Sequence, residues 1–190
     1  MAKIFPRTPF VKRYLLAFAI WNLGIGAFNP FFTAYFSRQL HMSVPRIGLV
    51  YSTTQFVELG ALLAAPVVLR RFGIVSGISM MQAGAALSLA LLAIGPPALA
   101  AGVIYAMFGA FQVMSEPATF TLLMSRVEAD QRAGASSLNF FITSVSQAAS
   151  SAVAGVSIVH FGYRPLLIFA SITTAFAAWL FNRLLAESAG

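Results

Sequence analysis

Two glutamates lie deep inside apolar stretches of the sequence, where a carboxyl group has unusual chemistry. Glu58 and Glu116 precede the basic residues Arg70 and Arg126 by 12 and 10 positions. In a helix this places them about 15–18 Å from those residues, near the middle of a hydrocarbon core about 30 Å thick. A carboxyl group there favours its neutral form, and it is able to take up and release a proton. Both glutamates are therefore candidates for proton coupling; the alternative is a permanently protonated structural role.

Amide side chains recur in four of the same apolar stretches. They are Asn22 and Asn29 in the first, Gln55 in the second, Gln112 in the fourth and Asn139 in the fifth. Polar side chains at this depth usually face the protein interior, so we expect these five to line the path of a small-molecule substrate. The third and sixth stretches are poorer in polar residues and are expected to be peripheral. Alternatively, the amides join helices through hydrogen bonds of about 0.6 kcal/mol each.

Enzymatic and metal chemistry lack their usual residues. The 190-residue chain has no cysteine and two histidines, His41 and His160, which fall near the ends of apolar stretches. Gly77-Ile78-Ser79-Met80 lacks the closing glycine of the Gly-x-Ser-Gly motif of intramembrane serine proteases. We therefore expect no enzymatic activity, no cofactor and no metal site. The net charge of +7 comes from basic residues scattered singly or in pairs, so nucleic acid is not an expected partner.

The elements that must position these residues are transmembrane helices. The sequence is 59% hydrophobic and 9% charged, whereas a soluble domain carries about 25% charged residues. A helix needs about 20 apolar residues to cross the hydrocarbon core. Six stretches meet this condition, and they span residues 14–35, 47–69, 74–94, 98–124, 133–160 and 165–185. The first expected partner of the chain is therefore the lipid bilayer.

Basic residues are divided unequally between the two ends of these spans. The N-terminal side holds Lys3, Arg7, Lys12, Arg13, Arg70, Arg71, Arg126, Arg132 and Arg183, and the other side holds Arg38, Arg46 and Arg164. Because cytoplasmic loops carry the excess of Lys and Arg, this division predicts that both termini are cytoplasmic. We expect an integral protein of the plasma membrane, in bacteria the inner membrane, with a basic cytoplasmic lead (1–13) and a transmembrane bundle (14–190).

Three short sequence features occur twice, in the same order and at offsets of 87, 86 and 89 residues. They are Asn29-Pro30 and Glu116-Pro117, Arg46-Ile47-Gly48 and Arg132-Ala133-Gly134, and Arg71-Phe72-Gly73 and His160-Phe161-Gly162. An odd number of spans in each unit inserts the second copy upside down, as in many secondary transporters. The sequence thus predicts an all-α membrane protein with a 3+3 inverted repeat, whose two units cover about 14–94 and 98–185.

The chain resembles the C-terminal half of a major facilitator superfamily transporter over nearly its whole length. The resemblance is carried by Asn29-Pro30-Phe31-Phe32, the turn 70–73 and the segments 128–135 and 155–163. In the family's loop motif G-x-x-x-D-R-x-G-R-[RK], Arg71 and Gly73 match, and Arg70 takes the position of Asp. The resemblance implies a second six-helix half, or a second copy of the chain, around one central path.

The expected function is secondary active transport of a small solute, coupled to protons through Glu58 or Glu116. The alternative is an inactive fragment or a scaffold membrane protein without transport activity.

Overall fold

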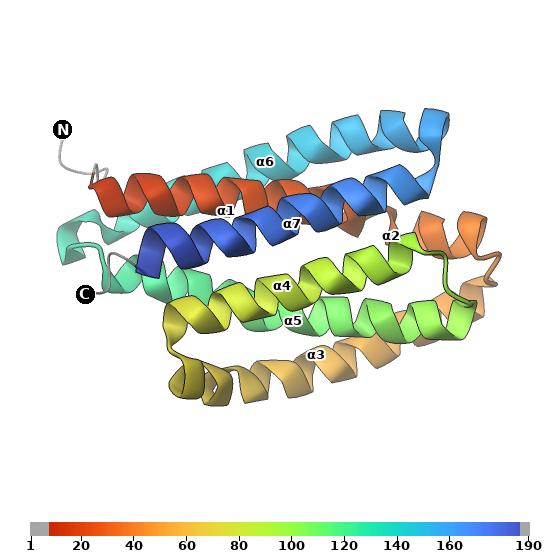
Figure 1. Cartoon of the computed structure of the whole chain (residues 1–190), viewed down its shortest axis with the longest axis horizontal. Coiled ribbons are helices and arrows are strands. Elements are labelled where there is room, and N and C mark those ends of the chain that lie inside the picture. Colours follow the sequence, from red (N-terminus) through yellow and green to blue (C-terminus); the bar gives the residue numbers. More distant parts are fainter. Residues whose placement is uncertain (1–7, 187–190) are drawn as a thin grey trace.

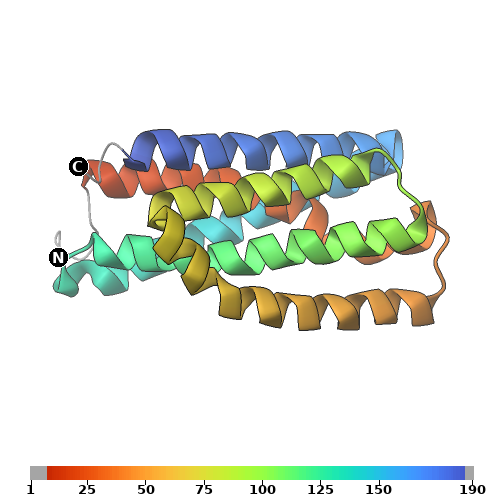
Figure 2. The same cartoon turned by 60° about the horizontal axis from the view of Figure 1, so that its bottom comes forward.

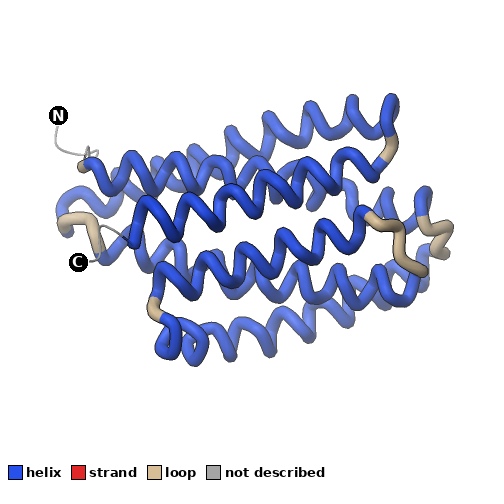
Figure 3. The backbone as a smooth tube through the Cα atoms, viewed as in Figure 1, coloured by secondary structure: helices blue, strands red, loops and turns tan. Residues whose placement is uncertain are grey.

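The computed structural model describes residues 8–186 of the chain, and short loops at the two ends of one bundle join their helices (Figure 3). In order, the elements are α1 (Pro9–Phe28), η1 (Asn29–Phe31), α2 (Phe32–Ala34), η2 (Tyr35–Gln39), α3 (Val44–Phe72), α4 (Ile74–Ala93), α5 (Ala98–Ser125), η3 (Ala129–Gln131), α6 (Arg132–Phe161) and α7 (Tyr163–Ala186). The described residues contain no strand, and the all-α prediction is confirmed.

Six helical segments of the described chain are long and apolar enough to cross a membrane, as the sequence predicts. The first begins earlier than expected, because Pro9 suits the first helical turn and the Thr8 hydroxyl accepts a hydrogen bond from the Val11 N–H at 3.3 Å. The end of the expected basic lead, from Pro9 to Arg13, is therefore helical. Residues 1–7 of that lead lie outside the described residues.

The helices pack as a row that curls back on itself. Neighbours follow the order α6, α1, α7, α4, α5, α3, so that α6 and α3 form the opposite edges in Figure 1 and α7 and α4 lie between them. The row curls enough for α5 to reach α6 as well. The start of α1 and the end of α7 lie at the same end of the bundle, together with the α3–α4 and α5–α6 loops (Figures 1 and 2).

The row is symmetric: when α1 is exchanged with α5, α3 with α6 and α4 with α7, the same neighbours result, in the reverse order. Equivalent details recur at the ends of α3 and α6, where Gly73 and Gly162 have φ angles of 81° and 76°. Their N–H groups donate to Leu69 O at 2.9 Å and to Ile158 O at 3.0 Å. Glycine is favoured at both positions because other residues rarely adopt positive φ. The structure thus has the predicted 3+3 fold, while the residue limits of the two repeats stay a prediction.

The expectation that the third and sixth spans are peripheral is wrong for this bundle. In the most apolar windows of α4 and α7, 50% and 44% of the residues are buried, against 11% in α3 and 17% in the span of α6. Small residues bring α4 and α7 together: the Ser171 hydroxyl donates to Ala86 O at 2.8 Å, and Ala170 and Ala177 are fully buried. Few polar residues in a span therefore do not mean that it faces lipid.

Helices α1 and α6 run parallel in one register. Tyr14, Asn22 and Gly26 contact residues that lie 125 positions later in the sequence. Pro30 has no N–H to donate to the carbonyl of Gly26, and the Ser151 hydroxyl of α6 bonds that carbonyl at 2.8 Å. This approach requires glycine, because a β-carbon at position 26 would lie 2.5 Å from Gln147 Cα.

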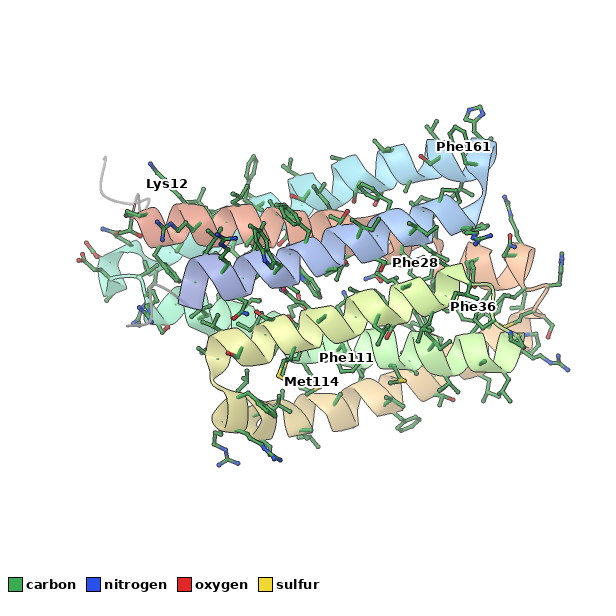
Figure 4. All side chains as sticks on the ribbon, viewed as in Figure 1. Lys12, Phe28, Phe36, Phe111, Met114 and Phe161 are labelled. Atoms are coloured by element: carbon green, nitrogen blue, oxygen red, sulfur yellow. The ribbon has the colours of Figure 1, made fainter. Side chains whose placement is uncertain are left out.

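Aromatic rings fill the bundle near the end opposite the start of α1. Phe28 and Phe36 are fully buried there (Figure 4), and the Phe32 ring stacks on Tyr105 with centroids 4.8 Å apart. The Tyr35 hydroxyl donates to Leu92 O, at the end of α4, at 3.1 Å. These contacts fix the first span to α4 and α5 beyond its 3₁₀ turn at Asn29–Phe31.

The loop positions predict a sidedness for the membrane-inserted chain. Reporter fusions after Arg71 and after Gln131 should report one side of the membrane, and a fusion after Pro97 should report the other. Alkaline phosphatase and green fluorescent protein activities in cells measure this directly. Equal reports at Arg71 and Pro97 would contradict the six-span fold.

The α1–α6 contact predicts an asymmetry between two glycines. Gly26→Ala should lower the free energy of unfolding by about 1–3 kcal/mol, because the added methyl group meets the α6 backbone. Gly60→Ala is the matched control, since nothing lies within 4 Å of a β-carbon there. Thermal unfolding in detergent measures both variants. The packing argument fails if Gly26→Ala unfolds at the wild-type temperature.

Candidate functional site

A cavity of about 470 Å³ lies where α1, α5 and α6 meet, and we call it the Glu116 cavity. Its polar lining consists of Asn22, Gln112, Glu116, Thr119, Asn139, Thr143 and Gln147. Its aromatic lining consists of Phe18, Trp21, Phe120 and Phe140, and Ile25, Leu62, Val113 and Pro117 complete the wall. The volume lies within the range of small-molecule sites, about 300–1,000 Å³.

Helical periodicity gathers these side chains from three elements. On α5, Gln112, Glu116 and Thr119 follow at spacings of four and three residues, and on α6 Asn139, Thr143 and Gln147 follow at spacings of four. Residues with these spacings share one face of a helix. The curl of the helix row turns the faces of α5 and α6 towards α1, and the cavity forms between them.

Hydrogen bonds between α1 and α6 hold one wall of the cavity. The Tyr14 hydroxyl donates to Asn139 Oδ1 at 3.1 Å, and Gln147 Nε2 donates to Asn22 Oδ1 at 3.0 Å. Asn22 Nδ2 in turn donates to Phe18 O at 2.8 Å. Because both polar atoms of the Asn22 amide are engaged within the protein, Asn22 positions Gln147 as well as lining the cavity.

Asn29 holds the opposite wall, although it does not itself line the cavity. Its Nδ2 donates to Gln112 Oε1 at 3.3 Å, from the 3₁₀ turn that follows α1 to the face of α5. Four of the five amides predicted for the substrate path therefore meet around one space, Asn29 through its bond to Gln112.

Gln55 is the exception among these amides. It lies on α3, has an exposed side chain and is not part of the cavity wall. Only three residues of α3 are buried, namely Ile47, Thr54 and Ala65. Gln55 therefore lies on a face of α3 that the other five spans leave uncovered, because α3 lies at one edge of the row.

Glu116 is the only ionisable side chain among the cavity-lining residues of the described chain. It is followed by Pro117, which has no N–H, so the carbonyl of Val113 in the same wall loses its usual helical donor. Pro66 has the same effect on the carbonyl of Leu62, the contribution of α3 to the wall. The cavity wall thus combines one carboxyl group with two residues, Val113 and Leu62, whose backbone carbonyls lack their helical N–H.

Glu58 lies apart from the cavity, in the contact between α3 and α5. A β-carbon on Gly109 would collide with Glu58 Oε1 and would lie 3.1 Å from Thr54 Cγ2. Gln147 contacts Gly26 in a comparable way, between α6 and α1. The two predicted proton-coupling residues therefore occupy different environments, and Glu116 alone lines the cavity.

The predicted motif residues lie at the α3–α4 loop, outside the cavity wall. Arg70 and Arg71 end α3, and the Arg71 guanidinium lies 5.5 Å from the centre of the Phe72 ring. Gly73 connects the two helices with its positive φ angle. In this structure the three residues form a helix end and a tight turn.

Sequence reasoning missed the aromatic part of the cavity. Phe18 and Trp21 share a helix face with Asn22 and Ile25, so their spacing relative to Asn22 was an available signal. Phe120 and Phe140 were harder to recognise, because aromatic residues are abundant on every face of these helices. Metal binding gains no support, since no group of three or more His, Cys, Asp or Glu gathers within residues 8–186.

Comparison with known families identifies the architecture. The sequence model of the Major Facilitator Superfamily matches residues 14–189. Neither the curated proteins nor the solved structures contain a match.

The cavity predicts which engineered thiols react with a water-soluble reagent. The chain has no cysteine, so single-cysteine variants report without background. Thr143→Cys should react with a methanethiosulfonate reagent at least about tenfold faster than Thr174→Cys, because Thr143 lines the cavity and Thr174 is fully buried. Labelling rates in detergent, followed by mass spectrometry, measure the difference. Equal rates would contradict a solvent-filled cavity at Thr143.

Proposed function

Because the chain belongs to the major facilitator superfamily, we propose that its bundle is half of a secondary active transporter for a small solute. The chain is an integral membrane protein, and members of this family are transporters rather than enzymes. The observation that carries the proposal is the Glu116 cavity, with its single ionisable group and its polar and aromatic walls. Intramembrane carboxyl groups are costly and are typical of proton relays and solute pathways.

Proton coupling is proposed to act through Glu116. Protonation removes its charge, so the two protonation states differ in their affinity for a charged solute and in the cost of enclosing the carboxyl group. Glu58 is the second candidate, because it is the other glutamate within the six spans. Its place in the α3–α5 contact favours an effect on helix packing over direct contact with a solute in the cavity.

Alternating access requires a second bundle against which this one moves. We propose that a second copy of the chain or another polypeptide supplies it. The support is the exposure of α3 and α6, which place side chains such as Tyr51, Gln55 and Ser144 on the outside of this bundle. Substrate accumulation by chains that are shown to be monomeric in liposomes would contradict this part of the proposal.

The orientation follows from the division of basic residues. We propose that the end carrying Arg71, Arg126 and Arg132 is cytoplasmic, together with both termini. The fusions after Arg71 and Gln131 described above should then report the cytoplasm.

The central test replaces the carboxyl group by an amide of the same size. Glu116→Gln should abolish proton-driven accumulation in proteoliposomes, because an amide does not titrate, while downhill exchange persists in part. Uptake under an imposed pH gradient, compared with exchange without a gradient, measures the two activities. Glu128→Gln is the matched control, since Glu128 lies in the exposed α5–α6 loop.

Glu58→Gln and the double variant complete this experiment. Glu58→Gln should weaken solute uptake through altered packing and leave the dependence on the pH gradient in place. Accumulation at the wild-type level by the double Gln variant would reduce both glutamates to structural roles. If no variant and no wild-type protein accumulates any solute, the chain is a scaffold or an inactive fragment.

A further inference from the structure

The charge balance of the Glu116 cavity points to the solute that it accepts. Among the lining residues of the described chain, Glu116 is acidic, and none is Lys, Arg or His. An anionic solute would therefore meet a carboxylate and no counter-charge, and the two negative charges would repel each other. A cationic solute would neutralise that carboxylate. The negative charge of Glu116 therefore excludes an anionic solute and favours a cationic one.

The aromatic lining has the same preference. Trp21, Phe18, Phe120 and Phe140 all contribute to the wall. The face of an aromatic ring carries partial negative charge and attracts a cation within about 6 Å, most strongly for tryptophan. Aromatic walls also accept the apolar body of an organic ion, which a bare metal ion lacks. The cavity therefore suits a cation with apolar substituents.

The backbone adds acceptors to the same wall. Pro117 and Pro66 leave the carbonyls of Val113 and Leu62 without their helical N–H donors. Carbonyl oxygens carry partial negative charge, and they accept hydrogen bonds from a protonated amine. The carboxyl group and the aromatic wall thus select the same charge, and any carbonyl of Val113 or Leu62 that reaches the ligand adds to it.

From these features we infer that the Glu116 cavity binds a small organic cation, an amine or quaternary ammonium with apolar groups, with Glu116 as its counter-ion. This inference rests on the proposed transport function and names its substrate class. A proton and the cation compete for the same carboxylate, so binding of the cation to the neutral carboxyl group releases one proton. Exchange of cations for protons follows from this competition without a second ionisable site.

The pH dependence of cation binding is assigned to Glu116 because no other ionisable side chain of the described residues lines the cavity. The elements packed on α5 contribute Arg46, Tyr51, Glu58, Arg70 and Arg71 from α3, Arg132 and His160 from α6, and Lys12, Arg13 and Tyr14 from α1, whereas α4 contributes none. Glu58 contacts Gly109, seven residues or about 10 Å along α5 from Glu116. The Tyr14 hydroxyl is engaged as the donor of a hydrogen bond to Asn139 Oδ1.

Two ions of the same shape and opposite charge provide the test. Equilibrium dialysis of the full chain in detergent should show saturable binding of tetraphenylphosphonium and at least about tenfold weaker binding of tetraphenylborate. The Trp179→Phe variant keeps Trp21 as its single tryptophan. Because Trp21 lines the cavity, the tryptophan fluorescence of this variant should change as tetraphenylphosphonium saturates the site. Binding should weaken as the pH falls, because protonation removes the charge of Glu116.

Variants at position 116 test whether the cation binding and its pH dependence come from Glu116. Glu116→Gln should weaken tetraphenylphosphonium binding by about tenfold or more and remove its pH dependence. Glu116→Asp, which keeps the charge, should retain both, and Glu128→Gln should bind as the wild type does. Tetraphenylborate binding as tight as tetraphenylphosphonium binding, absence of tetraphenylphosphonium binding, or an unaffected Glu116→Gln variant would each overturn the inference.

The two proposals fail separately. Proton-driven accumulation of another solute without binding of tetraphenylphosphonium leaves the transport function standing and rejects the substrate class. Binding of tetraphenylphosphonium that depends on Glu116, without any transport, supports the cation site and rejects the transport function.

Discussion

A backbone carbonyl that loses its hydrogen-bond donor inside a bilayer costs several kcal/mol, because no water is present to replace the donor. Pro30 creates this situation at Gly26, and the hydroxyl of Ser151 resolves it from the neighbouring helix. The bond forms only because Gly26 lets α6 approach the α1 backbone closely. One proline, one glycine and one serine therefore fix the register of two parallel helices, and that register brings Gln147 to Asn22 in the cavity wall.

The helices at the centre of the row and those at its edges are packed differently. Small residues join α4 and α7 closely in the middle of the row, and this contact relates the two three-helix units. The edge helices α3 and α6 instead keep most of their residues exposed. The bundle thus has a closely packed centre and exposed edges, as the proposed pairing with a second bundle requires.

The cavity concentrates the features that lower stability in a membrane protein. It contains a carboxyl group, its wall includes residues whose carbonyls lack their helical donors, and its volume is about 470 Å³. Hydrogen bonds between α1 and α6 and between Asn29 and Gln112 join the helices that surround the cavity. These bonds hold the wall, whereas none of them engages the Glu116 carboxyl group. Unfavourable groups gathered in one cavity and held by a rigid frame are typical of functional sites.

The sequence alone determined the number of spans, the inverted repeat and most of the polar residues of the site. The spans can be recognised in the sequence because a helix needs about 20 consecutive apolar residues to cross the lipid. Polar residues are rare within such stretches, which singles out Asn22, Gln112, Glu116 and Asn139. Only the tertiary structure decided which helices are neighbours. It placed α4 and α7 at the centre through small residues that carry no polarity signal, and it separated Glu58 from Glu116, for which the sequence predicts similar depths. Hydrophobic periodicity reports how far a residue lies along a helix and which face it occupies. The partner of that face depends on contacts between distant segments, such as those 85 positions apart in α4 and α7 and 125 positions apart in α1 and α6.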